Sequence, residues 1–276
     1  MATVLSAAGA VSIGTAGSSG AAQAAGLRAF GITADGTLMA TFSTDRPQVL
    51  DWVRVVTGLS GDTALLGIDF RVQNGLLYGV GNAGGIYTIT TPPTTPDVVV
   101  KKVSQLSVPL WGTNFGVDFN PAADRLRVVS DQGQNLRHNL ADGTTAEDAI
   151  LTTPPALGPT RGVTAAAYTN NDLNPDTATT LFDLNTATDQ VVIQSPANNG
   201  TLAPTGALGV DAGPNAGLDI YSELVNGKAV SATAFATLVS GSTNQASLYS
   251  VNLLTGAATA VGQFPLANTD IAVALG

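Results

Sequence analysis

The chain has no cysteine and a single histidine among its 276 residues. Disulfide scaffolds and thiolate metal sites are therefore excluded, because both require cysteine. Charged residues are also scarce, at 11% against 44% hydrophobic residues, which excludes a disordered polyelectrolyte. Beyond residue 26, no uninterrupted apolar run reaches the ~20 residues that a membrane-spanning helix needs. No transmembrane segment is predicted.

Positively charged residues are scarcer than negatively charged ones. The chain carries 11 Lys and Arg against 20 Asp and Glu, a net charge of -9, and Lys228 is the only basic residue after Arg161. Because nucleic acids are bound through clustered Lys and Arg, the composition excludes nucleic acid as a partner. A cation suits this charge balance better.

The composition also favours strands and turns over helices. Only Glu147 and Glu223 among the 20 acidic residues are glutamates, and the chain contains 31 glycines and 14 prolines. The excess of Asp over Glu, together with abundant Gly, Asn and Thr, favours turns and strands over helices. A chain of this length can fold as one all-β unit, so we predict a single all-β domain with almost no helix.

Residues 1–26 differ in composition from the rest, because they carry no charged side chain. An apolar stretch followed by Ala22, Gln23 and Ala24 is typical of the hydrophobic region and cleavage site of a secretory signal. The basic start of such a signal is missing, so a flexible tail of small residues is the alternative. We predict an exported protein, secreted, periplasmic or on the cell surface, with its domain at residues 27–276.

One short phrase recurs along the chain and defines a period. A degenerate fifth copy has Thr164 where the others have an aspartate, and the marked positions are 49, 46, 55 and 51 residues apart. Periods of this size, each followed by further short β runs, are typical of propeller blades. The four clear copies are Gly67–Phe70, Gly116–Phe119, Gly217–Ile220 and Asn268–Ile271.

The two ends of the chain together make one further period. Residues 270–276 supply a single strand, and residues 27–68 supply the rest of a blade. We therefore predict a five-bladed β-propeller closed by pairing of the C-terminal strand with the N-terminal blade, with six blades as the alternative if residues 172–217 hide another strand set. The predicted outer strands are Asp51–Thr57, Asp97–Val103, Gln190–Gln194 and Ala257–Val261.

Several longer strings resemble a known family. They are Gly31–Leu38, Phe115–Pro121 with Arg125–Arg137, Ala167–Asn171 and Thr179–Leu202. From about residue 27 to 276 the chain resembles the bacterial family known as domain of unknown function 4394. The resemblance implies an exported, propeller-like domain and carries no catalytic residue.

The repeated aspartate is the main candidate for chemistry, because equivalent positions on the innermost strands of a propeller face one another around its axis. Several carboxylates aimed at one axis repel unless a cation lies among them, and Ca²⁺ prefers such oxygen ligands. The alternative is structural, with each aspartate accepting hydrogen bonds from backbone N–H groups of the neighbouring blade. The candidate metal residues are Asp69, Asp118, Asp219 and Asp270.

A second group of candidates lies outside the repeat. Alternation in residues 125–130 places Arg125 and Arg127 on one strand face, and Arg127 or Arg137 could clamp a carboxylate bidentately. The structural alternative pairs these arginines with Asp124 or Asp131 on the rim. The candidate ligand-binding residues are Trp111, Arg127, Arg137 and His138.

These features together predict a function without catalysis. We expect an exported binding or structural module whose ligand the sequence does not identify. A glycan or a cell-surface component is the candidate partner, and Ca²⁺ is the candidate cofactor. The alternative is an extracellular hydrolase of glycosides or other polymers that uses the channel carboxylates as acid and base. The sequence leaves catalysis undecided and leans against it.

Overall fold

The computed structural model describes residues 26–276. The predicted signal peptide or tail at residues 1–26 thus lies, apart from its last residue, outside the described residues. The described chain is built from strands, with one short 3-10 turn, η1 (Ala197–Asn199), and no α-helix, as the composition predicts. No helix in this part of the chain is long and apolar enough to cross a membrane.

One sheet contains eight strands in the order β20-β1-β2-β3-β7-β6-β5-β4. It consists of two antiparallel groups of four, which β3 and β7 join through a short parallel pairing. The strands of this sheet are β1 (Arg28–Thr33), β2 (Leu38–Ser43), β3 (Leu50–Thr57), β4 (Leu65–Arg71), β5 (Leu76–Gly81), β6 (Gly85–Thr90), β7 (Val98–Gln105) and β20 (Asn268–Val273).

Three further antiparallel sheets contain four strands each. The first comprises β8 (Phe115–Asn120), β9 (Arg125–Ser130), β10 (Asn135–Asn139) and β11 (Thr144–Glu147). The second comprises β12 (Val163–Tyr168), β13 (Leu181–Asn185), β14 (Gln190–Gln194) and β15 (Leu202–Ala207). The third comprises β16 (Ala212–Val225), β17 (Lys228–Ser240), β18 (Ala246–Val251) and β19 (Ala258–Gln263).

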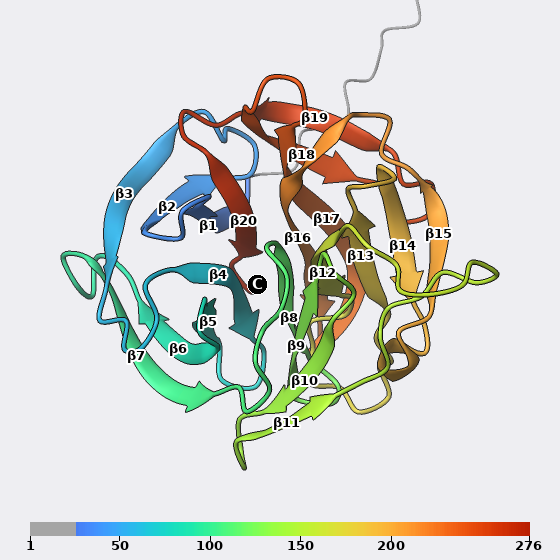
Figure 1. Cartoon of the computed structure of the whole chain (residues 1–276). Coiled ribbons are helices and arrows are strands. Elements are labelled where there is room, and N and C mark those ends of the chain that lie inside the picture. Colours follow the sequence, from blue (N-terminus) through green and yellow to red (C-terminus); the bar gives the residue numbers. More distant parts are fainter. Residues whose placement is uncertain (1–25) are drawn as a thin grey trace, which may run out of the picture.

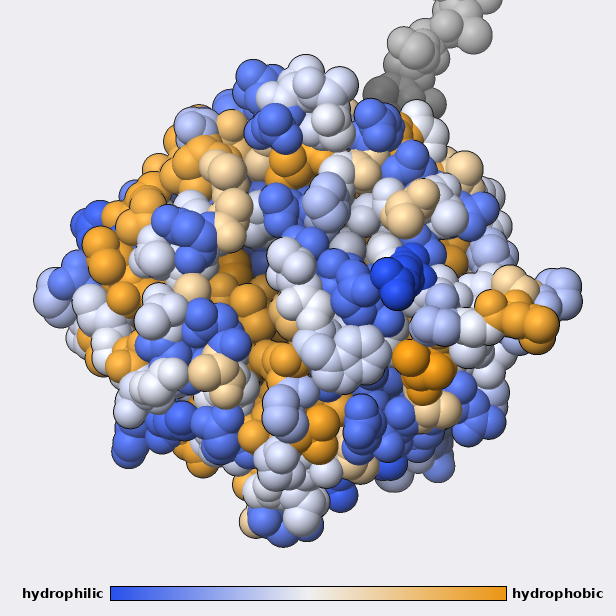
Figure 2. All heavy atoms as spheres, viewed as in Figure 1, coloured by the Kyte–Doolittle hydropathy of each residue, from blue (hydrophilic) through white to orange (hydrophobic). Residues whose placement is uncertain are grey.

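The sheets stand radially around a central axis, with β4, β8, β12, β16 and β20 innermost (Figure 1). This architecture is all-β and propeller-like. Each innermost strand carries one copy of the repeated phrase, as the periodicity predicts. Hydrophilic and hydrophobic residues are intermixed over the face seen in the same view (Figure 2).

The C-terminal strand joins the N-terminal part of the chain. Strand β20 pairs antiparallel with β1, from Ala29 opposite Val273 to Thr33 opposite Asn268. This pairing satisfies a backbone edge of β1 that would otherwise be free to recruit another strand. The arithmetic of the repeat therefore places the last strand correctly.

One strand assignment from the sequence is wrong. Gln190–Gln194 was predicted to be an outer strand, but it is β14, the third strand of its sheet, and β15 lies outside it. The sequence of β15 includes Pro204 and Gly206, two residue types that are uncommon in strands. Proline is tolerated at a sheet edge, where its missing N–H leaves no ladder bond unmade, and β15 is such an edge.

The core lies between neighbouring sheets. Alternation along β9 directs Leu126 and Val128 into the apolar cluster shared with the β4–β7 group, while Val129 joins the cluster shared with β12–β15. Arg127 alternates with Leu126 and Val128, so it lies on the face that meets the β12–β15 sheet. This face contains the polar network described below.

Glycines in the repeated phrase allow the innermost strands to approach closely. A Cβ added to Gly67 would lie 2.5 Å from a methyl group of Val117, and one added to Gly217 would lie 2.5 Å from the Cα of Asp270. Both distances are far shorter than a normal carbon–carbon contact of about 3.5–4.0 Å. The glycine two residues before the aspartate is therefore required by packing at the axis.

Candidate functional site

The structure brings three of the repeated aspartates together at the axis. Oxygens of Asp69 on β4, Asp118 on β8 and Asp219 on β16 lie within 4.8 Å of one another, and all three side chains are buried. Asp270 on β20 is buried beside them and raises the pKa of Asp69 and Asp118 through its charge. On β12 the corresponding position is Thr164, so the ring of carboxylates is incomplete.

Each axial aspartate accepts a hydrogen bond from the next innermost strand. The backbone N–H of Phe119 on β8 donates to Asp69 Oδ2 over 2.7 Å, and the N–H of Tyr168 on β12 donates to Asp118 Oδ1 over 3.1 Å. Neither N–H group belongs to the strand that carries its acceptor. These carboxylates therefore connect neighbouring sheets at the axis.

The same arrangement continues on the other side of the axis. The N–H of Val273 on β20 donates to Asp219 Oδ2 over 2.5 Å, and the N–H of Ile68 on β4 donates to Asp270 Oδ2 over 2.7 Å. The four bonds run in one direction around the axis, from each aspartate to the next innermost strand. We call these four carboxylates, Asp69, Asp118, Asp219 and Asp270, the axial clasps.

Burial changes the protonation of the axial clasps. It raises the pKa of Asp69, Asp118 and Asp270 well above the usual range, and their mutual repulsion adds to the effect. Burial also raises the pKa of Asp219, to about 6. Carboxyl groups of this kind retain protons at a pH where exposed aspartates are fully ionised.

These raised pKa values predict a fall in stability with rising pH. A carboxyl with a higher pKa in the folded than in the unfolded protein binds protons more tightly when folded, so its stabilising contribution disappears as the pH rises through the folded pKa. For Asp219 the window extends from 3.8 to about 6. We expect the free energy of unfolding, measured by urea titration, to decrease more steeply across this window in the wild type than in Asp219→Asn. Parallel profiles of the two proteins would contradict the assignment.

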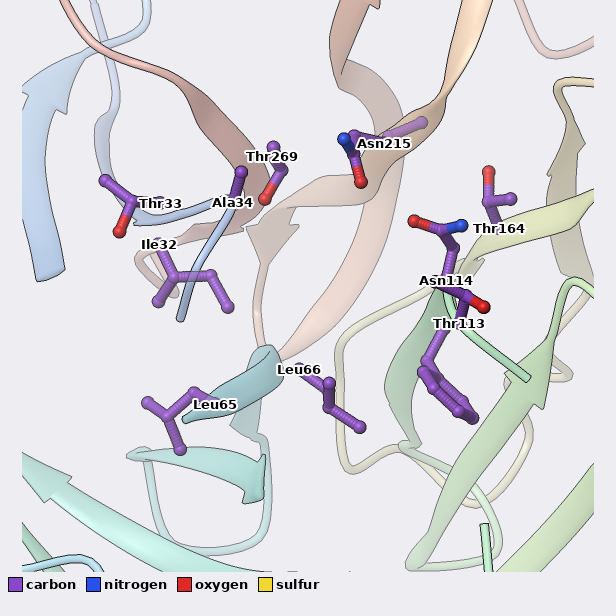
Figure 3. Close-up of a pocket in the computed structure, with 12 residues that line it drawn as sticks. Ile32, Thr33, Ala34, Leu65, Leu66, Thr113, Asn114, Thr164, Asn215 and Thr269 are labelled. Carbon is purple, nitrogen blue, oxygen red and sulfur yellow. The ribbon is translucent and has the colours of Figure 1, made fainter. Parts of the chain in front are cut away.

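A small cavity opens at one end of the axis, where the innermost strands begin (Figure 3). Its volume is about 60 Å³, enough for a few water molecules. Such a cavity admits water or an ion and is too small for a sugar. Its polar lining consists of Thr33, Thr113, Asn114, Thr164, Asn215 and Thr269.

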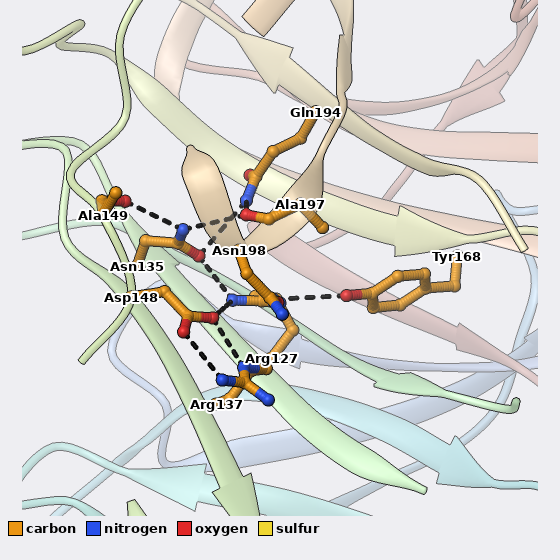
Figure 4. A network of polar contacts seen from close by, with 9 residues as sticks. All are labelled: Arg127, Asn135, Arg137, Asp148, Ala149, Tyr168, Gln194, Ala197 and Asn198. Atoms are coloured by element: carbon orange, nitrogen blue, oxygen red, sulfur yellow. Dashed lines mark hydrogen bonds and ion pairs between the residues drawn. The ribbon is translucent and has the colours of Figure 1, made fainter. Parts of the chain in front are cut away.

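A second polar group, away from the axis, is centred on Arg127 (Figure 4). Arg127 Nη1 lies 2.7 Å from Asp148 Oδ2, and Arg137 bonds both oxygens of the same carboxylate, at 2.7 and 2.9 Å. The pairing with Asp124 or Asp131 expected from the sequence is wrong. The register of the strands explains why both arginines bond Asp148. Arg127 on β9 lies opposite Arg137 on β10, and β11 is the next strand of the sheet. Asp148 is the residue that directly follows β11.

Arg127 makes three further hydrogen bonds within the protein. Nη1 also bonds Asn135, Nε bonds the Tyr168 hydroxyl at 3.2 Å, and Nη2 bonds Asn198 Oδ1 at 2.8 Å. The side chain is almost completely buried, with 1% of the residue exposed. Arg137 is half-buried and remains at the edge of this network.

The other two predicted ligand-binding residues lie elsewhere. His138 is buried, and its ring nitrogens bond the hydroxyls of Ser104 at 2.8 Å and Thr145 at 2.9 Å. Burial lowers its pKa, which favours the neutral ring. Trp111 is 40% exposed, in a loop whose backbone N–H donates to Gln134. The structure thus unites Arg127 with Arg137 but separates His138 and Trp111 from them.

Sequence analysis missed the buried acids Asp62, Asp172 and Asp183, of which only Asp183 lacks hydrogen-bond partners. Asp183 on β13 is fully buried, and neither of its carboxylate oxygens has a hydrogen-bond partner. Burial raises its pKa well above the usual range, although the charge of Arg127 acts in the opposite direction. An aspartate at an inward position of an otherwise apolar strand was the available signal, and only the neighbouring sheet shows which groups surround it.

Comparison with protein families gives one match, to the family described as "Domain of unknown function (DUF4394)", over residues 38–274. No curated protein matches the chain.

The solved structures that match the chain share little sequence with it. Hydrazine synthase of Kuenenia stuttgartiensis is 11% identical with a TM-score of 0.41, covering 74% of this chain and 51% of that one. Glutaminyl cyclase of Myxococcus xanthus is 12% identical with a TM-score of 0.48 and coverages of 76% and 89%. The WD40 domain of Toxoplasma gondii coronin is 11% identical with a TM-score of 0.40 and coverages of 83% and 55%. The chain thus spans about half the length of the first and third of these.

Proposed function

Because this chain belongs to the family described as "Domain of unknown function (DUF4394)", we propose its function from its own geometry: an exported, non-catalytic binding or structural module built as a five-bladed β-propeller. Export rests on the uncharged, small-residue character of residues 1–26. Recovery of a chain that retains residue 1 from inside the native cell, with none outside it, would refute this part.

The grouping of the strands supports the proposed count of five blades. The eight-stranded sheet divides at its short parallel junction into the groups β20-β1-β2-β3 and β4–β7, and each of the other three sheets has four strands. We interpret each antiparallel group of four as one blade. Residues 172–217 contribute β13, β14, β15 and the start of β16, which supports five blades over the six-bladed alternative.

One observation supports a function without catalysis: each axial clasp accepts a hydrogen bond from a backbone N–H of the next innermost strand. A general acid or base must reach a substrate, whereas these carboxyl groups are buried and already engaged. Their repetition around the axis suits architecture better than a unique active site. Neither the fold nor the comparisons support the hydrolase alternative.

Calcium at the axis is the second candidate role of the clasps, since the oxygens of Asp69, Asp118 and Asp219 lie close enough together to hold an ion. Asp69→Ala separates the two roles. Without its acceptor the buried N–H of Phe119 has no partner, and we expect a loss of about 1–3 kcal/mol in the free energy of unfolding.

Thermal unfolding in excess EDTA and after addition of Ca²⁺ is the measurement. If the clasps are structural, the loss in Asp69→Ala is the same in both conditions. A melting temperature that rises with Ca²⁺ in the wild type and not in Asp69→Ala would instead assign an ion site to the axis.

A further inference from the structure

A larger cavity lies beside the Arg127 network, where β12, β14 and η1 meet. Its volume is about 380 Å³, and its polar lining includes Asn120, Tyr168, Thr180, Gln194, Ser195 and Asn198. We propose that this cavity binds a neutral, polyhydroxylated ligand, the ring of a sugar. The inference gives the proposed binding module a ligand class and rests on that proposed function.

The size of the cavity suits a small molecule. Ligand pockets typically have volumes of about 300–1,000 Å³, so this cavity falls at the lower end of the range. The axial cavity, at about 60 Å³, is smaller than this range. The two also lie at different places, because this one adjoins the ends of β12 and β14 and the axial one adjoins the starts of the innermost strands.

Arg127 orients two groups of the lining. Its Nη2 donates to Asn198 Oδ1, so the amide oxygen faces the guanidinium and the NH₂ group of Asn198 remains available as a donor. Its Nε donates to the Tyr168 hydroxyl, which leaves the hydroxyl hydrogen free to donate elsewhere. A buried cation thus holds two side chains in orientations that can donate to a ligand oxygen (Figure 4).

An acceptor lies in the same lining. Gln194 is 1% exposed, and its side-chain NH₂ donates to Asn135 Oδ1 and to the carbonyl oxygen of Ala197. Its Oε1 has no hydrogen-bond partner. A buried acceptor without a partner is destabilising, and a hydroxyl group of a ligand can satisfy it once the side-chain amide turns toward the cavity. Sugars supply hydroxyls that donate and accept at the same time.

The charge of the site favours a neutral ligand over an anion. None of the side chains that line the cavity is charged. Arg127 has no free pair of N–H groups that could bind a carboxylate or phosphate in a bidentate way. It is buried and already bonds Asp148, Asn135, Tyr168 and Asn198. The ligand must therefore be recognised by uncharged donors and acceptors, as hydroxyl groups are.

The test compares matched variants of the full chain. Asn198→Asp keeps the oxygen that Arg127 bonds and replaces the NH₂ group with an acceptor, so the fold is retained and a donor is lost. Asn244→Asp makes the same change on an exposed turn between β17 and β18, where aspartate tolerates the positive φ of 56°. Tyr168→Phe removes the second donor.

Binding is measured by saturation-transfer NMR with D-glucose, D-galactose, D-mannose and N-acetyl-D-glucosamine, and with D-glucuronate as the charged counterpart. We expect at least one neutral sugar to bind the wild type and Asn244→Asp equally. We also expect Asn198→Asp and Tyr168→Phe to weaken this binding by roughly tenfold or more, since one lost hydrogen bond of about 1.4 kcal/mol corresponds to a factor of ten.

Three results would overturn the inference: no neutral sugar binds the wild type, glucuronate binds more tightly than every neutral sugar, or both cavity variants bind as the wild type does. In the last case the module still binds a sugar at another place, so the proposed function survives. Conversion of a bound sugar, seen as new resonances over time, would refute the non-catalytic function while leaving the cavity assigned.

Discussion

Gly116→Ala is expected to destabilise the protein by about 3 kcal/mol, the upper end of the usual cost of overpacking, because the neighbouring atoms cannot move aside. A Cβ added to Gly116 would lie 2.5 Å from the backbone nitrogen of Ala166 and 2.6 Å from the carbonyl carbon of Ala165. Both atoms belong to the main chain of β12, so no change of rotamer relieves the contact. The two innermost strands would have to separate, which also stretches the bond between Asp118 and Tyr168.

Urea unfolding of Gly116→Ala is compared with that of Gly143→Asn. Gly143 has a φ of 71° in the turn between β10 and β11, where an added Cβ meets nothing within 4 Å. Asparagine tolerates this backbone conformation, so we expect a change of about 0.5 kcal/mol or less. If the two variants were equally stable, the close approach of β8 and β12 would not be what requires glycine in the repeated phrase.

The second large effect is expected for Arg127→Met, which should lower the free energy of unfolding by about 3–5 kcal/mol. Arg127 is buried, and its removal takes donors away from Asn135, Tyr168 and Asn198 at once. It also leaves the buried Asp148 with one of its two partners. Methionine fills much of the same volume, so the loss reflects polar groups left without partners.

Arg137→Met supplies the matched control. Arg137 bonds the same carboxylate, but its side chain is 35% exposed and water can replace it. We expect a loss of about 1 kcal/mol or less, in line with other exposed ion pairs. Urea titration of both variants decides the matter. Equal losses would show that Asp148, and not the buried network around Arg127, is the stabilising element.

Much of the fold could be predicted from the sequence, because a repeated phrase at a period of about fifty residues is a local property of the chain. The spacing of Asp69, Asp118, Asp219 and Asp270 identified the innermost strands, and the division of one period between the two ends placed β20 beside β1. The weakest local signal, proline and glycine in β15, produced the one strand error.

The candidate site was predictable only in part. Alternation in β9 placed Arg127 on one face of its strand, but not opposite Asp148 or Asn198. Those contacts depend on the register of β11 and on a turn in the neighbouring sheet, 71 residues away from Arg127 in the sequence. Asp183 illustrates the same limit, because its lack of partners is a property of the surrounding sheets.

The sequence by itself determined which residues lie on innermost strands and that aspartate and glycine recur there, since strand periodicity and repeat spacing need only neighbours along the chain. Tertiary structure alone decided the direction in which the hydrogen bonds of the axial clasps run around the axis and the identity of each N–H donor. It also decided the raised pKa values and the cavity beside Arg127. These properties arise where separate sheets meet. The distance between a carboxylate and an N–H 50 residues away, as in Asp118 and Tyr168, is set by how the blades pack and not by any local pattern.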